Sequence, residues 1–154
     1  MKKLILTALV LLVGTGLFAQ TVFTAKASDA KAKVTVDAKK GSYAVDGVLA
    51  KGGVFTVDLT PDATTLAALK KGKSFTFSGK DLGSGAPDYV INVFTDAKDP
   101  IATPAKFSKA GAVVTVDFAK SKIAPDKITR VQVAAGFGKN GGPVKFELTG
   151  ITIK

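Results

Sequence analysis

The sequence predicts an all-β protein, folded as a single β-sandwich of about eight antiparallel strands. Apolar side chains recur at every second position and are often β-branched, as in strands with one buried face. Sixteen glycines, together with proline, asparagine and aspartate, supply turn signals, at spacings of about 8–12 residues as in sandwiches and barrels. No segment sustains the period of an amphipathic helix over a useful length.

Residues 1–19 are predicted to be a cleaved signal peptide. Two lysines precede the apolar run 4–12, and Leu17 and Ala19 fit the −3 and −1 positions of a cleavage site before Gln20. The alternative is a membrane anchor, which needs about 20 apolar residues. This run is shorter and is broken by glycine, so we expect no membrane span after cleavage.

Three parts follow from this division of the chain. The signal peptide covers residues 1–19, a loose polar leader covers 20–33, and the sandwich domain covers 34–154. The leader leaves room for one short strand at 21–24. Within the domain we expect strands over 34–37, 43–49, 54–59, 73–78, 88–95, 112–118, 128–135 and 144–154.

Alternation assigns the faces of these strands. The side chains predicted to point inward include Phe55, Val57, Leu59, Phe75, Phe77, Val114, Val116, Phe118, Val131 and Val133. The segment 88–95 is apolar on both faces, which predicts a central strand. Residues 61–69 could form a single helical turn ending near Gly72, while 79–87 and 96–104 are predicted loops.

Three aspartates, Asp37, Asp58 and Asp117, each follow a Thr-Val pair at unequal spacings. We interpret them as separate strand ends rather than as an internal repeat, because aspartate favours local backbone hydrogen bonds at turns. The glycine-rich segment 136–142 joins two strands and opens no helix, so a hairpin turn is preferred over phosphate binding.

The composition argues against catalysis. The chain has no histidine and no cysteine, which excludes a Ser-His-Asp arrangement and the commonest transition-metal ligands. A hydrolase that uses a pair of aspartates stays a minor alternative, because Glu147 is the only glutamate and lies on the solvent side of a strand. No catalytic residue is therefore predicted.

No cofactor is predicted either, and a structural calcium ion stays an alternative that no motif supports. Four loop aspartates have the oxygen chemistry of calcium ligands, but no spacing matches an EF-hand loop, and turn capping explains them better: Asp81, Asp88, Asp96 and Asp99.

The charge and the cysteine count bear on partners and compartment. The net charge is +10, almost all from lysine, and Arg130 is the only arginine. Arginine is the usual residue for bidentate phosphate recognition, so nucleic acid is not an expected partner. Weak attraction to anionic cell-surface polymers is an open alternative. An export signal without cysteine fits the periplasm or exterior of a bacterial cell.

The C-terminal segment KITRVQVAAGFGKNGGPVKFELTGITIK resembles the closing strands of jelly-roll, galactose-binding-like carbohydrate-binding modules. Ile128, Val131 and Val133 match the first strand of that pattern, and the second is matched by Phe146, Leu148, Ile151 and Ile153. The resemblance extends over roughly residues 43–154 and implies a jelly-roll sandwich that binds sugar without catalysis. Two departures are Thr149-Gly150, where the family often has a calcium-linked aspartate, and the absence of tryptophan.

Asn92 and Phe94 share one strand face, as do Arg130 and Gln132, and we assume that the two pairs lie on one sheet surface. Their planar polar groups suit sugar hydroxyls, and Phe94 offers a stacking surface. The reserve candidates are Tyr43, Tyr89 and Phe137. The expected partner is thus a polysaccharide or an envelope glycan. The alternative is a structural or adhesive envelope protein that binds no sugar and engages another protein through exposed β-edges or loops.

Overall fold

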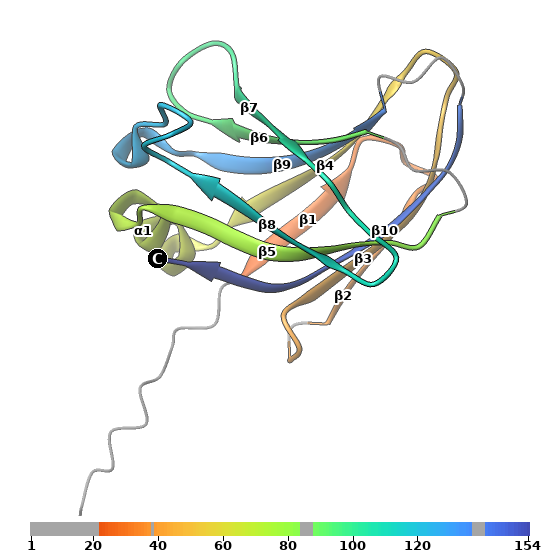
Figure 1. The fold of residues 1–154 in the computed structure, drawn as a ribbon, viewed down its shortest axis with the longest axis horizontal. Coiled ribbons are helices and arrows are strands. Elements are labelled where there is room, and N and C mark those ends of the chain that lie inside the picture. Colours follow the sequence, from red (N-terminus) through yellow and green to blue (C-terminus); the bar gives the residue numbers. More distant parts are fainter. Residues whose placement is uncertain (1–21, 38, 84–87, 137–140) are drawn as a thin grey trace, which may run out of the picture.

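The computed structural model describes residues 22–37, 39–83, 88–136 and 141–154, which form two antiparallel β-sheets packed face to face. The first sheet has five strands in the spatial order β1-β4-β9-β6-β7 (Figure 1). Its strands are β1 (Phe23–Ala27), β4 (Val54–Pro61), β9 (Arg130–Gly136), β6 (Tyr89–Phe94) and β7 (Ile101–Ala105).

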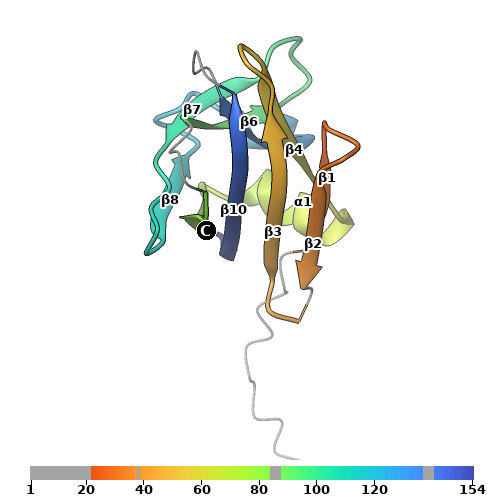
Figure 2. The ribbon, with the colours of Figure 1, turned by 90° about the vertical axis from the view of Figure 1, so that its right-hand side faces the viewer.

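The second sheet also has five strands, in the order β2-β3-β10-β5-β8. Figure 2 shows β3 and β10 side by side, with β2 and β8 toward the two sides. Its strands are β2 (Lys33–Asp37), β3 (Ser42–Leu49), β10 (Gly142–Ile153), β5 (Ser74–Asp81) and β8 (Ala112–Asp117). The predicted all-β sandwich is confirmed, with ten strands among the described residues in place of about eight.

The core lies between the two sheets and follows the predicted alternation. Every side chain that the period of two assigned to the interior is buried, with exposed fractions from 0% to 6%. Aromatic rings fill much of the space, including Phe75, Phe77, Phe118 and Phe146. Burial of apolar area at about 25 cal/mol per Å² makes this layer the main stabilising element of the domain.

One α-helix, α1 (Ala63–Lys71), connects β4 to β5 and is longer than the single turn expected there. Asp62 caps it, since its side chain accepts a hydrogen bond from the Thr65 backbone N–H at 2.7 Å. The helix also contributes to the core, because Leu69 is fully buried. A short 3-10 helix, η1 (Pro125–Lys127), precedes β9.

The short strand allowed at 21–24 in the polar leader is present as β1, with different bounds. Its Phe23 is 2% exposed and its alanines alternate toward the core. The expectation of a loop over 96–104 is wrong. The predicted loop 96–104 contains most of β7, which tolerates Pro104 because it lies at a sheet edge and needs fewer N–H donors.

The central strand predicted over 88–95 corresponds to β6, an inner strand that pairs with β9 and β7. Its inward side chains are buried, whereas its outward ones are only half-buried.

The last strand contains a bulge that explains a feature of the sequence. The register of β10 against β5 shifts between Thr149 and Thr152, and Gly150 adopts a positive φ of 61° there. An extra residue at a bulge reverses which parity faces inward. The apolar phase therefore changes between Leu148 and Ile151, and both side chains remain in the core.

Phe107, in the connection from β7 to β8, packs across the sandwich. Its ring is stacked on Tyr89 of the first sheet, with the ring centroids 4.0 Å apart. It also meets Phe77 and Phe146 of the second sheet edge-on, at 6.0 and 5.7 Å. Gly79 of β5 gives this ring its space, because a Cβ there would lie 2.6 Å from Phe107 Cε1.

Candidate functional site

The outward surface of the first sheet carries a group of polar side chains on its inner strands β4, β9 and β6. Backbone pairing places Asp58, Gln132 and Asn92 in one row across these strands, and Arg130 opposite Phe94 in the next. Their sequence neighbours point into the core, so alternation turns these five outward. We call these five residues the polar face. The two predicted pairs thus lie together on one sheet surface.

A chain of hydrogen bonds links the row. Asn92 Nδ2 donates to Gln132 Oε1 at 3.0 Å, and Gln132 Nε2 donates to Asp58 Oδ1 at 2.8 Å. Arg130 Nη1 donates to the same Asp58 oxygen and forms an ion pair with it. Because each planar group is held by the next, the amides and the guanidinium have defined orientations before any ligand arrives.

Phe94 and Arg130 stack on one another. The Arg130 guanidinium carbon lies 3.7 Å from the centroid of the Phe94 ring, which is a cation–π contact. One face of the ring is therefore covered by the guanidinium plane. The ring is therefore not the bare stacking surface expected from the sequence, because the Arg130 guanidinium lies over it.

All five residues of the polar face are half-buried, and the side chains of Arg130 and Asp58 are 37% and 36% exposed. In the part of the chain that the structure describes, Asp58 Oδ2 and Asn92 Oδ1 accept no hydrogen bond from another protein group. Together with the remaining N–H groups of Arg130, they offer acceptors and donors to an incoming molecule. Such a mixture suits hydroxyl groups, which donate and accept.

The reserve candidates do not join this surface. Tyr43 and Tyr89 are 2% and 3% exposed and lie in the core, so neither ring can present a face to a sugar. Tyr43 Oη accepts a hydrogen bond from the Phe23 N–H, and Tyr89 is stacked on Phe107. Burial and the nearby Asp81 carboxylate raise the pKa of Tyr89 above its ordinary range. Phe137 lies outside the described residues.

Asp58 is the member of the polar face that sequence reasoning missed as a site residue. It was grouped with Asp37 and Asp117, which do accept hydrogen bonds from backbone N–H groups of the following turns. Asp58 instead lies inside β4, which continues to Pro61. The signal was available in the sequence, because Leu59 and Thr60 prolong the alternation beyond the aspartate.

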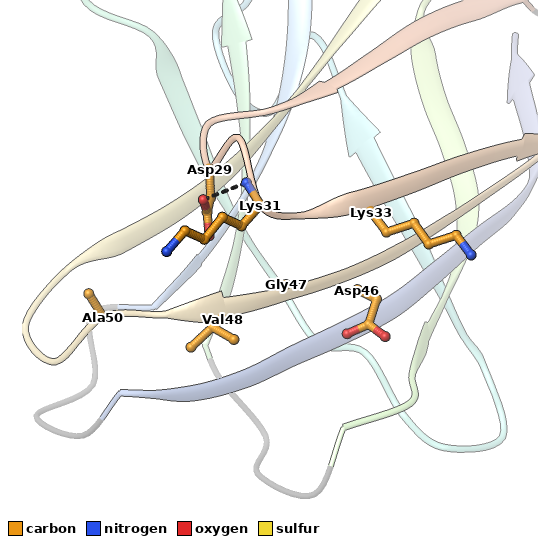
Figure 3. A pocket seen from close by; sticks show the side chains of 7 residues that line it. All are labelled: Asp29, Lys31, Lys33, Asp46, Gly47, Val48 and Ala50. Atoms are coloured by element: carbon orange, nitrogen blue, oxygen red, sulfur yellow. Dashed lines mark hydrogen bonds between the residues drawn. The ribbon is translucent and has the colours of Figure 1, made fainter.

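A second surface feature is a shallow hollow beside β3 and the turn between β1 and β2 (Figure 3). Asp46 in its lining already pairs with Lys145, at 2.9 Å. Figure 3 shows the side chains of Lys31 and Lys33 pointing away from one another, so they do not converge on a common ligand. We therefore consider the polar face the better candidate site.

The four loop aspartates considered as calcium ligands are not gathered in one place. Asp81 ends β5 and is 6% exposed, with its carboxylate accepting from the Gly83 N–H at 2.9 Å. Asp96 forms an ion pair with Lys127 at 3.1 Å. Within the described ranges, no three His, Cys, Asp or Glu side chains are grouped as they would be around a metal ion.

The search for membrane-spanning segments gives a simple result. None of the helices in the described part of the chain has the length and apolar character needed to cross a bilayer.

Comparison with known proteins identifies the fold. No protein-family model and no curated protein sequence matches the chain. Among solved structures, a family 11 carbohydrate-binding module from Clostridium thermocellum, in complex with a beta-1,3-1,4-mixed-linked tetrasaccharide, matches with 13% identity and a TM-score of 0.58. The match covers 85% of this chain and 87% of that module.

Two further structures are similar. The family 11 module of a cellulosomal cellulase of the same organism has 13% identity and a TM-score of 0.55, over 85% of this chain and 86% of that chain. The glycoside hydrolase domain of Endo-D from Streptococcus pneumoniae has 17% identity and a TM-score of 0.56, over 86% of this chain but 21% of its own. The chain therefore has the jelly-roll sandwich fold of carbohydrate-binding modules.

Proposed function

We propose that this protein is an exported, non-catalytic carbohydrate-binding module, and that the polar face of the first sheet holds the glycan. The observation that carries the proposal is the hydrogen-bonded row Asp58-Gln132-Asn92, with Arg130 stacked on Phe94 beside it. A row of preoriented planar groups across three strands offers hydrogen bonds at several points along a chain of sugar rings. The fold shared with carbohydrate-binding modules supports the same reading.

The preferred ligand is a neutral polysaccharide. Asp58 and Arg130 largely neutralise one another, so the polar face has no strong field that would select a charged sugar. The free oxygens of Asp58 and Asn92 accept from hydroxyls, while the guanidinium donates to them. The Arg130 guanidinium and the Phe94 ring, in contact on this face, would give a sugar ring a surface to pack on in place of the missing tryptophan.

The absence of an enzyme activity belongs to the same proposal. Glycoside hydrolysis uses two carboxyl groups that flank the scissile bond, about 5–10 Å apart. Asp58 is the only carboxylate among the five residues of the polar face, and it is committed to Arg130 and Gln132. We therefore assign Asp58 to ligand binding rather than to catalysis. Export to the periplasm or the cell exterior rests on the predicted signal peptide and gives the module access to such polysaccharides.

Affinity electrophoresis and calorimetry against soluble polysaccharides test the proposal. The panel contains mixed-linked β-glucan, other neutral glycans and one uronic-acid polymer. We expect a neutral glycan to bind, and Gln132→Ala to weaken that binding by about tenfold or more, since it breaks the row at its centre. Glu147→Ala is the matched control, because Glu147 is half-buried on the outward face of β10, the central strand of the second sheet.

Two results would contradict the proposal. One is the absence of binding to every glycan at millimolar sugar. The other is equal weakening by Gln132→Ala and Glu147→Ala, which would place the sugar elsewhere or indicate a general loss of folding. Selective binding of the uronic-acid polymer would contradict the neutral ligand class alone.

A further inference from the structure

The four edge strands of the sandwich are not equally protected. An edge strand presents free backbone N–H and C=O groups, and natural proteins discourage pairing there with lysine, proline or distortion. Lys26 lies in β1 and Lys33 in β2, and both side chains are exposed. Pro104 lies within β7. Each of these three edges therefore carries a residue that opposes the addition of another strand.

The fourth edge strand, β8, differs. Residues 112–116 have the sequence AVVTV, with no charge, no proline and a high content of β-branched residues. Val113 is 78% exposed, more than any other large apolar side chain in the described residues. A β-branched edge segment without charge, such as 112–116 of β8, has the properties of a pairing segment.

The hydrogen-bond pattern identifies the free groups of β8. The Phe118 N–H donates to Lys73 O of the chain leading into β5, so the Phe118 N–H is directed at β5. Backbone groups alternate in direction along an antiparallel strand, which makes Val116 and Val114 the next two residues with groups directed at β5. The backbone groups of Val113 and Thr115 consequently point away from β5, to the open side.

We propose that β8 is the self-association surface of this protein and pairs antiparallel with β8 of a second copy. With Val114 opposite its own counterpart, Val113 of each copy lies opposite Thr115 of the other, and their free N–H and C=O groups bond reciprocally. No like charges face one another between residues 112 and 116, so the strand is complementary to itself. The second sheets of the two copies then form one continuous sheet across the dimer interface.

The association is expected to strengthen with salt. The full sequence carries a net charge of +10, and only Lys2 and Lys3 are lost with the predicted signal peptide, so two copies repel one another at long range although their interface is uncharged. Salt screens exposed charges beyond about 10 Å at 0.1 M. A pairing held by backbone hydrogen bonds and apolar contact should persist while that repulsion falls, whereas an association held by surface ion pairs would weaken.

Sedimentation equilibrium of the purified protein, at increasing concentration and at low and high salt, measures the association. We expect a monomer–dimer equilibrium that Val113→Lys weakens by about tenfold or more, because it adds the lysine that the other edges have. Val48→Lys is the matched control. Val48 is 65% exposed on β3, an inner strand of the same sheet. Its replacement by lysine should change the dimerisation constant by no more than about twofold.

Amide hydrogen exchange locates the dimer interface. Dimerisation should slow exchange of the Val113 and Thr115 N–H groups in the wild-type protein, and Val113→Lys should abolish this slowing. A protein that stays monomeric up to about 1 mM at high salt, or equal effects of Val113→Lys and Val48→Lys, would overturn the proposal. So would protection confined to β2 or β7.

Discussion

The contact between Gly79 and Phe107 allows a quantitative test of how the two sheets are joined. Gly79 lies within β5, and a Cβ at this position would approach Phe107 Cε1 to 2.6 Å. Ordinary contacts of a Cβ begin at 3.4 Å, so Gly79→Ala requires a displacement of nearly 1 Å. The ring cannot move freely, because it is stacked on Tyr89 and meets Phe77 and Phe146.

The expected free-energy changes follow from these contacts. Overpacking of this size costs about 1–3 kcal/mol of unfolding free energy. Replacing a strand glycine by alanine contributes about 0.5–1 kcal/mol in the other direction. Gly79→Ala should therefore destabilise the protein by about 1–2 kcal/mol. Phe107→Ala should cost about 3 kcal/mol, the lower end for a phenylalanine, because Phe107 is only half-buried.

The double variant separates steric conflict from other causes. Once Phe107 is alanine, the added methyl group at position 79 has space, and Gly79→Ala becomes neutral or slightly stabilising. Urea denaturation of the four proteins should give a coupling free energy of about 2 kcal/mol, with the double variant more stable than the sum of the single changes predicts. Additive effects within about 0.5 kcal/mol would refute the packing of Phe107 on Gly79.

Three other predictions concern charged and ionisable groups. Asp58→Asn should lower the unfolding free energy by at most about 1 kcal/mol in urea denaturation, because the Arg130 pair is more than one-third exposed; a larger loss would contradict this. The hydrogen bond from the Thr65 N–H lowers the pKa of Asp62. The Asp62 cap therefore stabilises the fold above the unfolded pKa of about 4, and this contribution is lost as the pH falls. The difference in unfolding free energy between wild type and Asp62→Ala should accordingly narrow from pH 7 to pH 3. Burial raises the pKa of Tyr89. In a Tyr43→Phe variant, ultraviolet titration should therefore detect the Tyr89 phenolate only well above a pH of about 10. The unfolding free energy should fall as the pH rises past that value.

Much of the fold follows from side-chain alternation alone. A period of two assigns Val57, Leu59 and Val133 to the core, and the structure buries all three completely or nearly so. The same parity forces Asp58, Asn92 and Gln132 outward. What parity cannot supply is which strands are neighbours. That β4, β9 and β6 adjoin, and therefore that these polar side chains meet, depends on long-range pairing which a single sequence does not encode locally.

The features that differ from expectation have physical reasons. β7, predicted to be a loop, and β1, whose bounds differ from the expected 21–24, are edge strands. A lysine or proline costs little there, so their sequences contain the residues that usually mark loops. Tyr89 and Tyr43 were candidate ligand residues because tyrosine is often exposed at binding surfaces. Both instead have hydroxyl partners inside the core, which no local pattern announces.

The two proposed surfaces occupy different sheets, and this arrangement has a consequence for binding. The polar face lies on the first sheet, whereas β8 is an edge of the second. Pairing through β8 therefore leaves Asp58, Asn92 and Gln132 of both copies uncovered. A polysaccharide with repeated sites that reaches the polar faces of both copies would bind the second face intramolecularly. This raises the apparent affinity without a new contact. Val113→Lys should then lower affinity for a long glycan but leave affinity for a short oligosaccharide unchanged, whereas Gln132→Ala should lower both.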